Sequence, residues 1–185
     1  FSFEYRAMKG KNEYFHPFLR LGCRYLEVFS DKPIELEYIG ICPQVYPVQE
    51  KKYTVDNSLD REIYDLSYNT LNLCMMEHYV DCPWREQCLY AFDSRNQMLC
   101  GYYAFENGNA EYVKANLSLI VNDTRADGIL SITYPSGNKL AIPSFSLHLL
   151  TECVECIWII ALRILCMELS TLLFCLSYKL WSQVA

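Results

Sequence analysis

The chain has 185 residues, which leaves room for one domain, or for a small domain and part of a second. Sixteen basic residues against 22 acidic ones give a formal net charge of −6, which argues against a nucleic-acid-binding surface, since such surfaces carry clustered Lys and Arg. Hydrophobic residues make up 52% and charged residues 21%, and there are only seven glycines and seven prolines. These values exclude a disordered or collagen-like chain and indicate a globular protein.

Residues 1–50 have the pattern of β-strands. Ile34 to Tyr38 alternates apolar and acidic residues, and this period of two is typical of a half-buried strand. The stretch from Phe18 to Val28 is rich in aromatic and branched residues, and Ser30 to Pro33 supplies a turn between the two. We therefore predict that residues 1–50 form the β part of the chain.

Helices are predicted after residue 50. Asn57 and its neighbours offer an N-cap, after which apolar residues recur at helical spacing. Ser94 is expected to cap a second helix. The expected helices run over 57–79, over 94–105, from 109, and from about 145 after a loop at 123–144. A β part followed by helices predicts two domains rather than a βαβ alternation.

Residues 149–185 form an apolar tail, dense in Leu, Ile and Cys, that differs from the rest of the chain. Its longest uncharged run, Leu169 to Tyr178, has ten residues, whereas a helix needs about 20 apolar residues to cross a bilayer. We therefore expect no membrane span, and a membrane anchor is kept as the alternative.

The ten cysteines are irregularly spaced, and the chain opens Phe-Ser-Phe-Glu-Tyr without an initiator Met or an apolar leader. We expect reduced thiols in a cytoplasmic protein, with a disulfide framework as the alternative. The missing initiator also suggests that the chain begins in mid-protein.

The densest chemistry lies in residues 81–96, which hold three carboxylates, two arginines and three aromatic residues. In a sugar pocket, carboxylates accept hydrogen bonds from vicinal hydroxyls, aromatic faces cover the ring, and a protonated carboxyl donates to the glycosidic oxygen. A loop of solvated ion pairs has the same composition, and composition alone favours that reading.

The full string decides between the two. Asp81-Cys82-Pro83-Trp84-Arg85-Glu86, with Asp93 seven residues later, resembles the signature of the bacterial α-L-rhamnosidases, a family of inverting six-hairpin glycosidases. Shorter stretches agree with the same family: Leu21 to Val28, Asn69 to Leu71, and Ile142 to Leu147, where Cys23 and Ser144 depart from its pattern. The resemblance covers roughly residues 14–148.

The resemblance implies an α+β fragment. Residues 1–50 would be the end of a β-sandwich domain, residues 51–148 the first helices of an (α/α)6 barrel, and residues 149–185 an aberrant tail. A shift of reading frame after Glu155 is one explanation of the tail. One permitted choice of codons then gives a sequence similar to the next helix of the family.

The resemblance also implies the roles of the site residues. Glu86 matches the general acid, Asp81 and Asp93 match the carboxylates that hold rhamnose hydroxyls, Arg85 matches an arginine that shapes the pocket, and Trp84 and Tyr90 are candidates for its aromatic wall. We expect crowding by Asp81 and Asp93 to raise the pKa of Glu86, as a proton donor near neutral pH requires, whereas pairing with Arg85 would oppose this rise.

The implied function is the release of terminal α-L-rhamnose from rhamnose-containing glycosides, without a cofactor or metal. An inverting mechanism needs a second carboxylate that activates water, and in the family this base lies downstream of the region present here. The chain is therefore expected to be inactive as it stands. The alternative is a non-catalytic sugar-binding or scaffold fragment.

Overall fold

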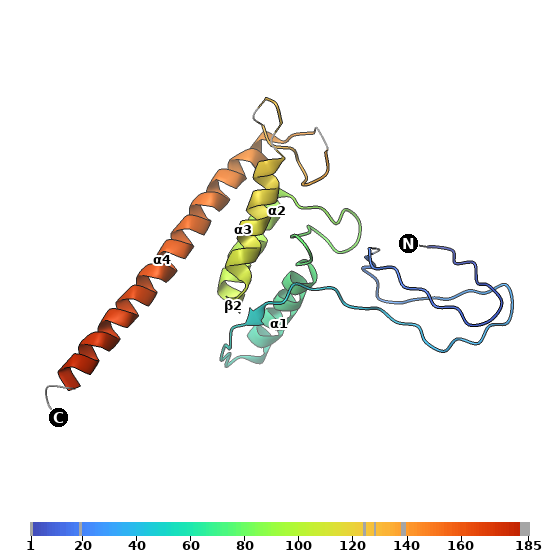
Figure 1. The fold of residues 1–185 in the computed structure, drawn as a ribbon, viewed down its shortest axis with the longest axis horizontal. Helices are drawn as coiled ribbons and strands as arrows, with labels where there is room; N and C mark the ends of the chain where they lie inside the picture. Colours follow the sequence, from blue (N-terminus) through green and yellow to red (C-terminus); the bar gives the residue numbers. More distant parts are fainter. Residues whose placement is uncertain (1, 19, 124, 128, 138–139, 182–185) are drawn as a thin grey trace.

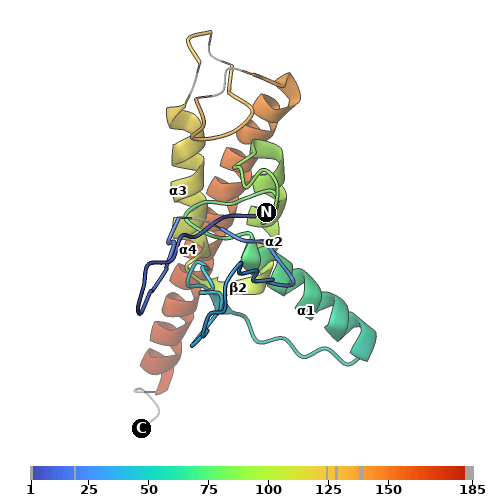
Figure 2. The same cartoon turned by 90° about the vertical axis from the view of Figure 1, so that its right-hand side faces the viewer.

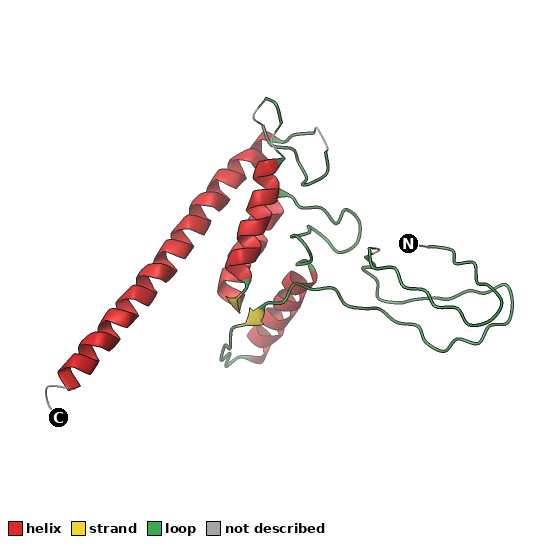
Figure 3. Cartoon of the chain, viewed as in Figure 1, coloured by secondary structure: helices red, strands yellow, loops and turns green. Residues whose placement is uncertain are grey.

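A computed structural model describes residues 2–18, 20–123, 125–127, 129–137 and 140–181 of the chain. Its elements are β1 (Gln49–Glu50), α1 (Ser58–Leu73), α2 (Ala91–Ala104), β2 (Phe105–Asn107), α3 (Asn109–Asn122) and α4 (Pro143–Trp181). Figures 1 and 3 show a helical body beside a long extended segment. Within the described residues, the fold is thus a small α+β arrangement of four helices and one two-stranded sheet.

The strands predicted at 18–28 and 34–38 are not formed in the described part of residues 2–48. This segment runs as extended chain to one side of the helical body (Figure 1). The strand β1 follows this segment directly and pairs antiparallel with β2. An alternating pattern makes one face of a strand apolar, but a strand forms only where a partner takes up its backbone hydrogen bonds. The boundary predicted near residue 50 remains a prediction.

Helix α1 begins where the sequence predicted. Asn57 is its N-cap, and the Asn57 side chain accepts a hydrogen bond of 2.9 Å from the backbone N–H of Leu59. The helix ends at Leu73, six residues before the predicted end at Tyr79. The backbone N–H of Tyr79 is instead bonded to the side chain of Asn116 on α3, at 2.8 Å. The N–H of Tyr79, which a longer helix would have bonded internally, thus donates to a side chain 37 residues away.

Helix α2 begins at Ala91, three residues before the predicted cap. Ser94 lies inside its first turn and is buried, so its predicted role as N-cap is wrong. The reason is tertiary: Tyr134 donates its backbone N–H to the carbonyl of Leu89 at 3.0 Å, which holds the chain extended up to the start of the helix. Helix α3 begins at Asn109, as predicted, after Gly108 at a φ of 84° that favours glycine.

Helix α4 begins within two residues of its predicted start, and its first half packs against α2 and α3. Figure 1 shows α4 starting beside the end of α3 and then diverging from it, and Figure 2 shows α1 pointing away from both. The core lies between the end of α1, α2, α3 and the start of α4. Its largest fully buried side chains are Tyr79, Tyr112, Phe105, Met75, Leu89, Met98 and Ile120.

In the described residues, Pro143–Leu162 of α4 is long and apolar enough to cross a membrane by length and composition, with a mean hydropathy of 1.7. The segment carries two acidic side chains, Glu152 and Glu155, and both of them contact α2. The segment is therefore at least partly the packing helix of the body. The side chains after Leu162, including Glu168, lie outside what the structure describes.

Candidate functional site

The loop between α1 and α2 carries five of the six predicted site residues, and Asp93 follows in the first turn of α2. Two bonds close the loop on itself. The backbone N–H of Asp81 donates to the carbonyl of Cys88 at 3.0 Å, and the Asp81 carboxylate accepts the backbone N–H of Cys88 at 2.9 Å. Asp81 thus anchors the loop, and one of its oxygens is already used for that purpose.

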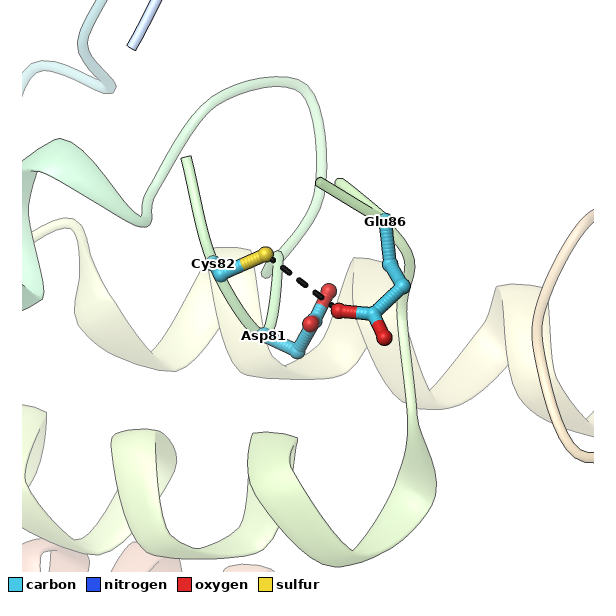
Figure 4. Close-up of side chains that lie close together, drawn as sticks. All are labelled: Asp81, Cys82 and Glu86. Atoms are coloured by element: carbon cyan, nitrogen blue, oxygen red, sulfur yellow. Dashed lines mark hydrogen bonds between the residues drawn. The ribbon is translucent and has the colours of Figure 1, made fainter. Parts of the chain in front are cut away.

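Glu86 is held by neighbours on the same loop. Its carboxylate accepts a hydrogen bond from the thiol of Cys82 at 3.4 Å and pairs with the guanidinium of Arg85. Figure 4 shows the Glu86 carboxylate turned toward Cys82 and Asp81. The side chain of Glu86 is 31% exposed, whereas that of Arg85 is 79% exposed. Glu86 therefore lies at the edge of the body, with its carboxyl turned back over the loop.

The expected rise in the pKa of Glu86 is contradicted by this arrangement. A hydrogen bond with the Asp81 side chain lowers the pKa of Glu86 most, and the bond from Arg85 lowers it next; burial opposes both. Arg85 and Cys82 donate hydrogen bonds to Glu86, and because Glu86 is near the surface, solvent screens the repulsion between the carboxylates.

The pKa of Asp93, unlike that of Glu86, is raised. Burial raises its pKa, and the negative charges of Asp81 and then Glu86 add to that rise. Burial also raises the pKa of Tyr90, and Cys88 and then the carboxylates of Glu86, Asp81 and Asp93 add to that rise. The structure therefore brings Asp81, Glu86, Asp93 and Tyr90 close enough for their charges to interact, while their roles in a sugar site remain predictions.

The two predicted aromatic residues, Trp84 and Tyr90, lie in different surroundings. Trp84 is 48% exposed on the outer side of the loop, whereas Tyr90 meets the ring of Phe145, at the start of α4, with centroids 6.2 Å apart. Phe92 contacts Phe145 at 6.0 Å and His148 at 4.5 Å. Sequence reasoning missed these α4 residues as wall candidates, because nothing in the local pattern shows that residue 145 returns to residue 90.

Gln87 is a further residue that the sequence did not single out. Its φ of 52° places it in the left-handed region, which costs a residue other than glycine about 1–3 kcal/mol. The side-chain amide donates to the carbonyls of Pro83 at 3.1 Å and of Arg20 at 3.3 Å. These bonds turn the chain directly after Glu86, and they fasten the loop to the extended N-terminal segment.

The N-terminal segment approaches the loop at Gly22 as well. A Cβ at Gly22 would lie 2.2 Å from the carbonyl oxygen of Pro83, so only glycine fits at this contact. Arg20 forms an ion pair with Glu77, which lies near the start of the loop. Gly22 belongs to the stretch Leu21 to Val28 that resembles the rhamnosidases, and it lies against Pro83 of the signature.

Asp81, Cys82 and Glu86 also form a possible ligand set for a metal ion. One ligand atom from each lies within 4.8 Å of the other two. Two carboxylates and a thiol could coordinate a divalent cation, although Arg85 already neutralises Glu86. The expectation that the site needs no metal stays a prediction.

Eight cysteines are described as free thiols, among them Cys82 and Cys88 on the loop. Cys166 and Cys175 lie outside the described side chains. The cytoplasmic location inferred from the cysteines remains a prediction.

Two solved structures share this fold. One is described as the crystal structure of the GH78 family rhamnosidase of Bacillus sp. GL1; it is 31% identical over 60% of this chain, with a TM-score of 0.54. The chain resembles part of a rhamnosidase. The other is a rhamnosidase from Klebsiella oxytoca with rhamnose bound, 24% identical over 60% of this chain, with a TM-score of 0.52, and this match shows the fold alone.

The matched region is a small part of each rhamnosidase. It covers 12% of the Bacillus chain and 22% of the Klebsiella chain. No protein-family profile matches the sequence, and a search of curated proteins finds no match either. The rhamnosidase-like fragment predicted from the sequence is supported at the level of the fold, while the (α/α)6 barrel and the residue roles remain predictions.

Proposed function

We propose that this chain carries the rhamnose-binding residues and the general acid of a glycoside hydrolase. The enzyme releases terminal α-L-rhamnose from glycosides with inversion. The observation that carries the proposal is the convergence of Asp81 and Glu86 on one loop, with carboxylate oxygens within 4.8 Å. It stands in a chain whose fold is similar to part of two rhamnosidases. Paired carboxylates suit vicinal sugar hydroxyls, and the nearby rings suit the apolar face of a sugar.

In this proposal, Glu86 is the acid that protonates the leaving oxygen, and Asp81 and Asp93 accept hydrogen bonds from rhamnose. Arg85 shapes the rim, and Trp84 and Tyr90 contribute ring faces. The substrates are rhamnose-containing glycosides, the protein acts in the cytoplasm, and no cofactor or metal takes part.

The water-activating base is proposed to lie outside these residues. In inverting glycosidases the two carboxyl groups stand about 6.5–9.5 Å apart, which leaves room for the attacking water. Asp81 does not leave that room, since its carboxylate lies within 4.8 Å of Glu86 and already accepts the backbone N–H of Cys88. The isolated chain is therefore expected to bind rhamnose without hydrolysing rhamnosides.

The state of Glu86 favours a second candidate function, a non-catalytic sugar-binding or scaffold fragment. Hydrogen bonds to Asp81 and Arg85 lower the pKa of Glu86. An ionised carboxylate accepts hydrogen bonds but has no proton to donate. Glu86 as it lies in this chain therefore suits binding better than proton transfer.

Binding of L-rhamnose to the whole chain, followed by ligand-observed NMR, tests the proposal. L-fucose is the matched ligand, because it is also a 6-deoxy-L-hexose but differs in the orientation of its hydroxyls. We expect binding of L-rhamnose over L-fucose, lost in Asp81→Asn and Asp93→Asn and kept in Asp127→Asn, which changes an exposed acid on another loop. Absence of rhamnose binding, or equal binding of both sugars, would contradict the proposal.

A nitrophenyl α-L-rhamnoside separates the two candidate functions. Rhamnose binding without release of nitrophenol is the result expected for this chain. Turnover that Glu86→Gln removes would overturn the expected inactivity and the binding-fragment alternative, and it would place the base within these residues.

A further inference from the structure

Glu152 is a buried acid at the contact between α4 and α2. It is 1% exposed and ranks among the largest fully buried side chains of the described residues. An ionised carboxylate in such a place is costly unless a cation or several donors compensate for the lost water. The contacts of Glu152 therefore bear on its protonation state.

If Glu152 is ionised, Ser94 faces two acceptors but has only one hydroxyl proton to donate. The Ser94 hydroxyl oxygen lies 3.1 Å from the carbonyl of Ala91 and 3.2 Å from the Glu152 carboxyl. A hydroxyl has one proton to donate, and the carbonyl of Ala91 can only accept. Both contacts are full hydrogen bonds if Ser94 donates to Ala91 and a protonated Glu152 donates to Ser94.

The neighbouring cation is already engaged. Arg95 binds Glu155 through two contacts, Nε to Oε2 at 3.0 Å and Nη2 to Oε1 at 2.5 Å. This fork-to-fork pair fixes α4 on α2 one turn beyond Glu152 and neutralises the guanidinium. The hydrogen-bond partners of Glu152 are thus the Ser94 hydroxyl and the backbone of Arg95, and neither carries a charge.

Among the titratable groups near Glu152, only Arg95 carries a positive charge, and it is paired with Glu155. Glu155, Cys153 and Cys156 lie on α4, Tyr134 lies on the loop before it, Tyr79 lies on the segment after α1, and Arg95 lies on α2. Burial accordingly raises the pKa of Glu152 to about 8, against smaller opposing effects from Ser94 and Arg95.

We propose that Glu152 is a positioning residue that holds α4 on α2 as a neutral acid, with its O–H donated to Ser94. Release of this proton weakens the contact and disturbs the first turn of α2, in which Asp93 precedes Ser94. The consequence for Asp93 rests on the proposed function, whereas the proton on Glu152 does not. Stability should fall as the pH rises from about 4.5 to about 8, because the folded state then binds the extra proton.

Thermal unfolding of the whole chain between pH 6 and pH 9, compared with Glu152→Gln, tests the proposal. The amide is always neutral, keeps the shape of the side chain and can donate to Ser94. We expect the wild-type melting temperature to fall by about 5–10 °C more than that of Glu152→Gln. Glu155→Gln is the control, since it removes a neighbouring acid and should leave the pH dependence in place.

Infrared difference spectra give a readout that a merely structural role would not move. The wild type at pH 7 should show the C=O stretch of a protonated carboxylic acid, and Glu152→Gln should lack it. Equal pH profiles for wild type and Glu152→Gln, or no difference in this band, would overturn the proposal. If Glu152→Gln does not fold, the band of the wild type alone, recorded at pH 7 and pH 9, still decides the protonation state.

Rhamnose binding at pH 6 and pH 9 tests the link to Asp93. Affinity should fall in the wild type and stay level in Glu152→Gln. If rhamnose binds at neither pH, the proposed function fails, and the melting and infrared results still decide the role of Glu152.

Discussion

Residues 2–48 and residues 58–122 are both rich in apolar residues. The described side chains of the first region are largely exposed, whereas the second region supplies much of the core. In the first region Phe18, Phe29 and Tyr38 are all more than 80% exposed, whereas in the second Tyr79, Leu89 and Tyr112 are at most 2% exposed. A helix satisfies its own backbone, so it needs only a neighbour for one face. A strand needs a hydrogen-bonded partner as well, and in the described part of residues 2–48 no strand is formed; the one sheet of the described residues pairs Gln49–Glu50 with Phe105–Asn107.

The loop at 81–90 belongs to the second region and contacts the first. It is tied to the core through Leu89 and Tyr134, and it receives the N-terminal segment through Gln87, Arg20 and Gly22. The candidate site therefore borders the packed core on one side and the exposed N-terminal segment on the other. Substitutions in the core should lower stability more than substitutions in the N-terminal segment.

The largest expected effect comes from the same substitution made once in each region. Leu89→Ala empties a fully buried position and should lower the free energy of unfolding by about 2–5 kcal/mol. Leu36→Ala, at a position 53% exposed, should change it by less than about 0.5 kcal/mol. Urea unfolding of both variants gives the values, and equal losses would show that residues 2–48 are packed as well as the helices.

A smaller effect is expected at the contact between the regions. Gly22→Ala places a methyl 2.2 Å from the backbone of Pro83, and such overpacking costs about 1–3 kcal/mol if the segment stays in place. Because the segment is largely exposed, it should move away instead, and hydrogen exchange should then rise in a peptide that spans residues 81–88.

Gly40→Ala is the control for this variant. The added methyl at Gly40 meets only the hydroxyl end of Tyr38, an exposed and flexible side chain. Exchange in residues 81–88 should be unchanged in Gly40→Ala. If Gly22→Ala also leaves it unchanged, the contact between the N-terminal segment and the loop is not formed in solution.

The smallest effect is expected at the N-cap of α1. Asn57→Ala removes the acceptor for the N–H of Leu59 and should lower stability by about 1 kcal/mol. Asn57→Asp keeps an acceptor at the cap and should restore it. A loss in Asn57→Ala that Asp does not recover would mean that the cap bond is not what stabilises this end of the helix.

The sequence by itself determined the features that depend on neighbours along the chain. Asn57 caps α1 because its acceptor reaches an N–H two residues away, and α3 begins at Asn109 directly after a glycine with positive φ. The signature from Asp81 to Asp93 also gave the carboxylates that the loop brings together, since five of the six predicted site residues share one short segment.

Tertiary structure decided the rest, because the deciding partners are distant in the sequence. Asn116 takes the N–H of Tyr79 and α1 stops early; Tyr134 pairs with Leu89 and α2 starts early. The pKa of Glu86 falls rather than rises because Glu86 shares a hydrogen bond with the Asp81 carboxyl and pairs with the guanidinium of Arg85. Ser94 looks like a helix cap in the sequence, yet it faces Glu152, 58 residues further on, which no local pattern could show.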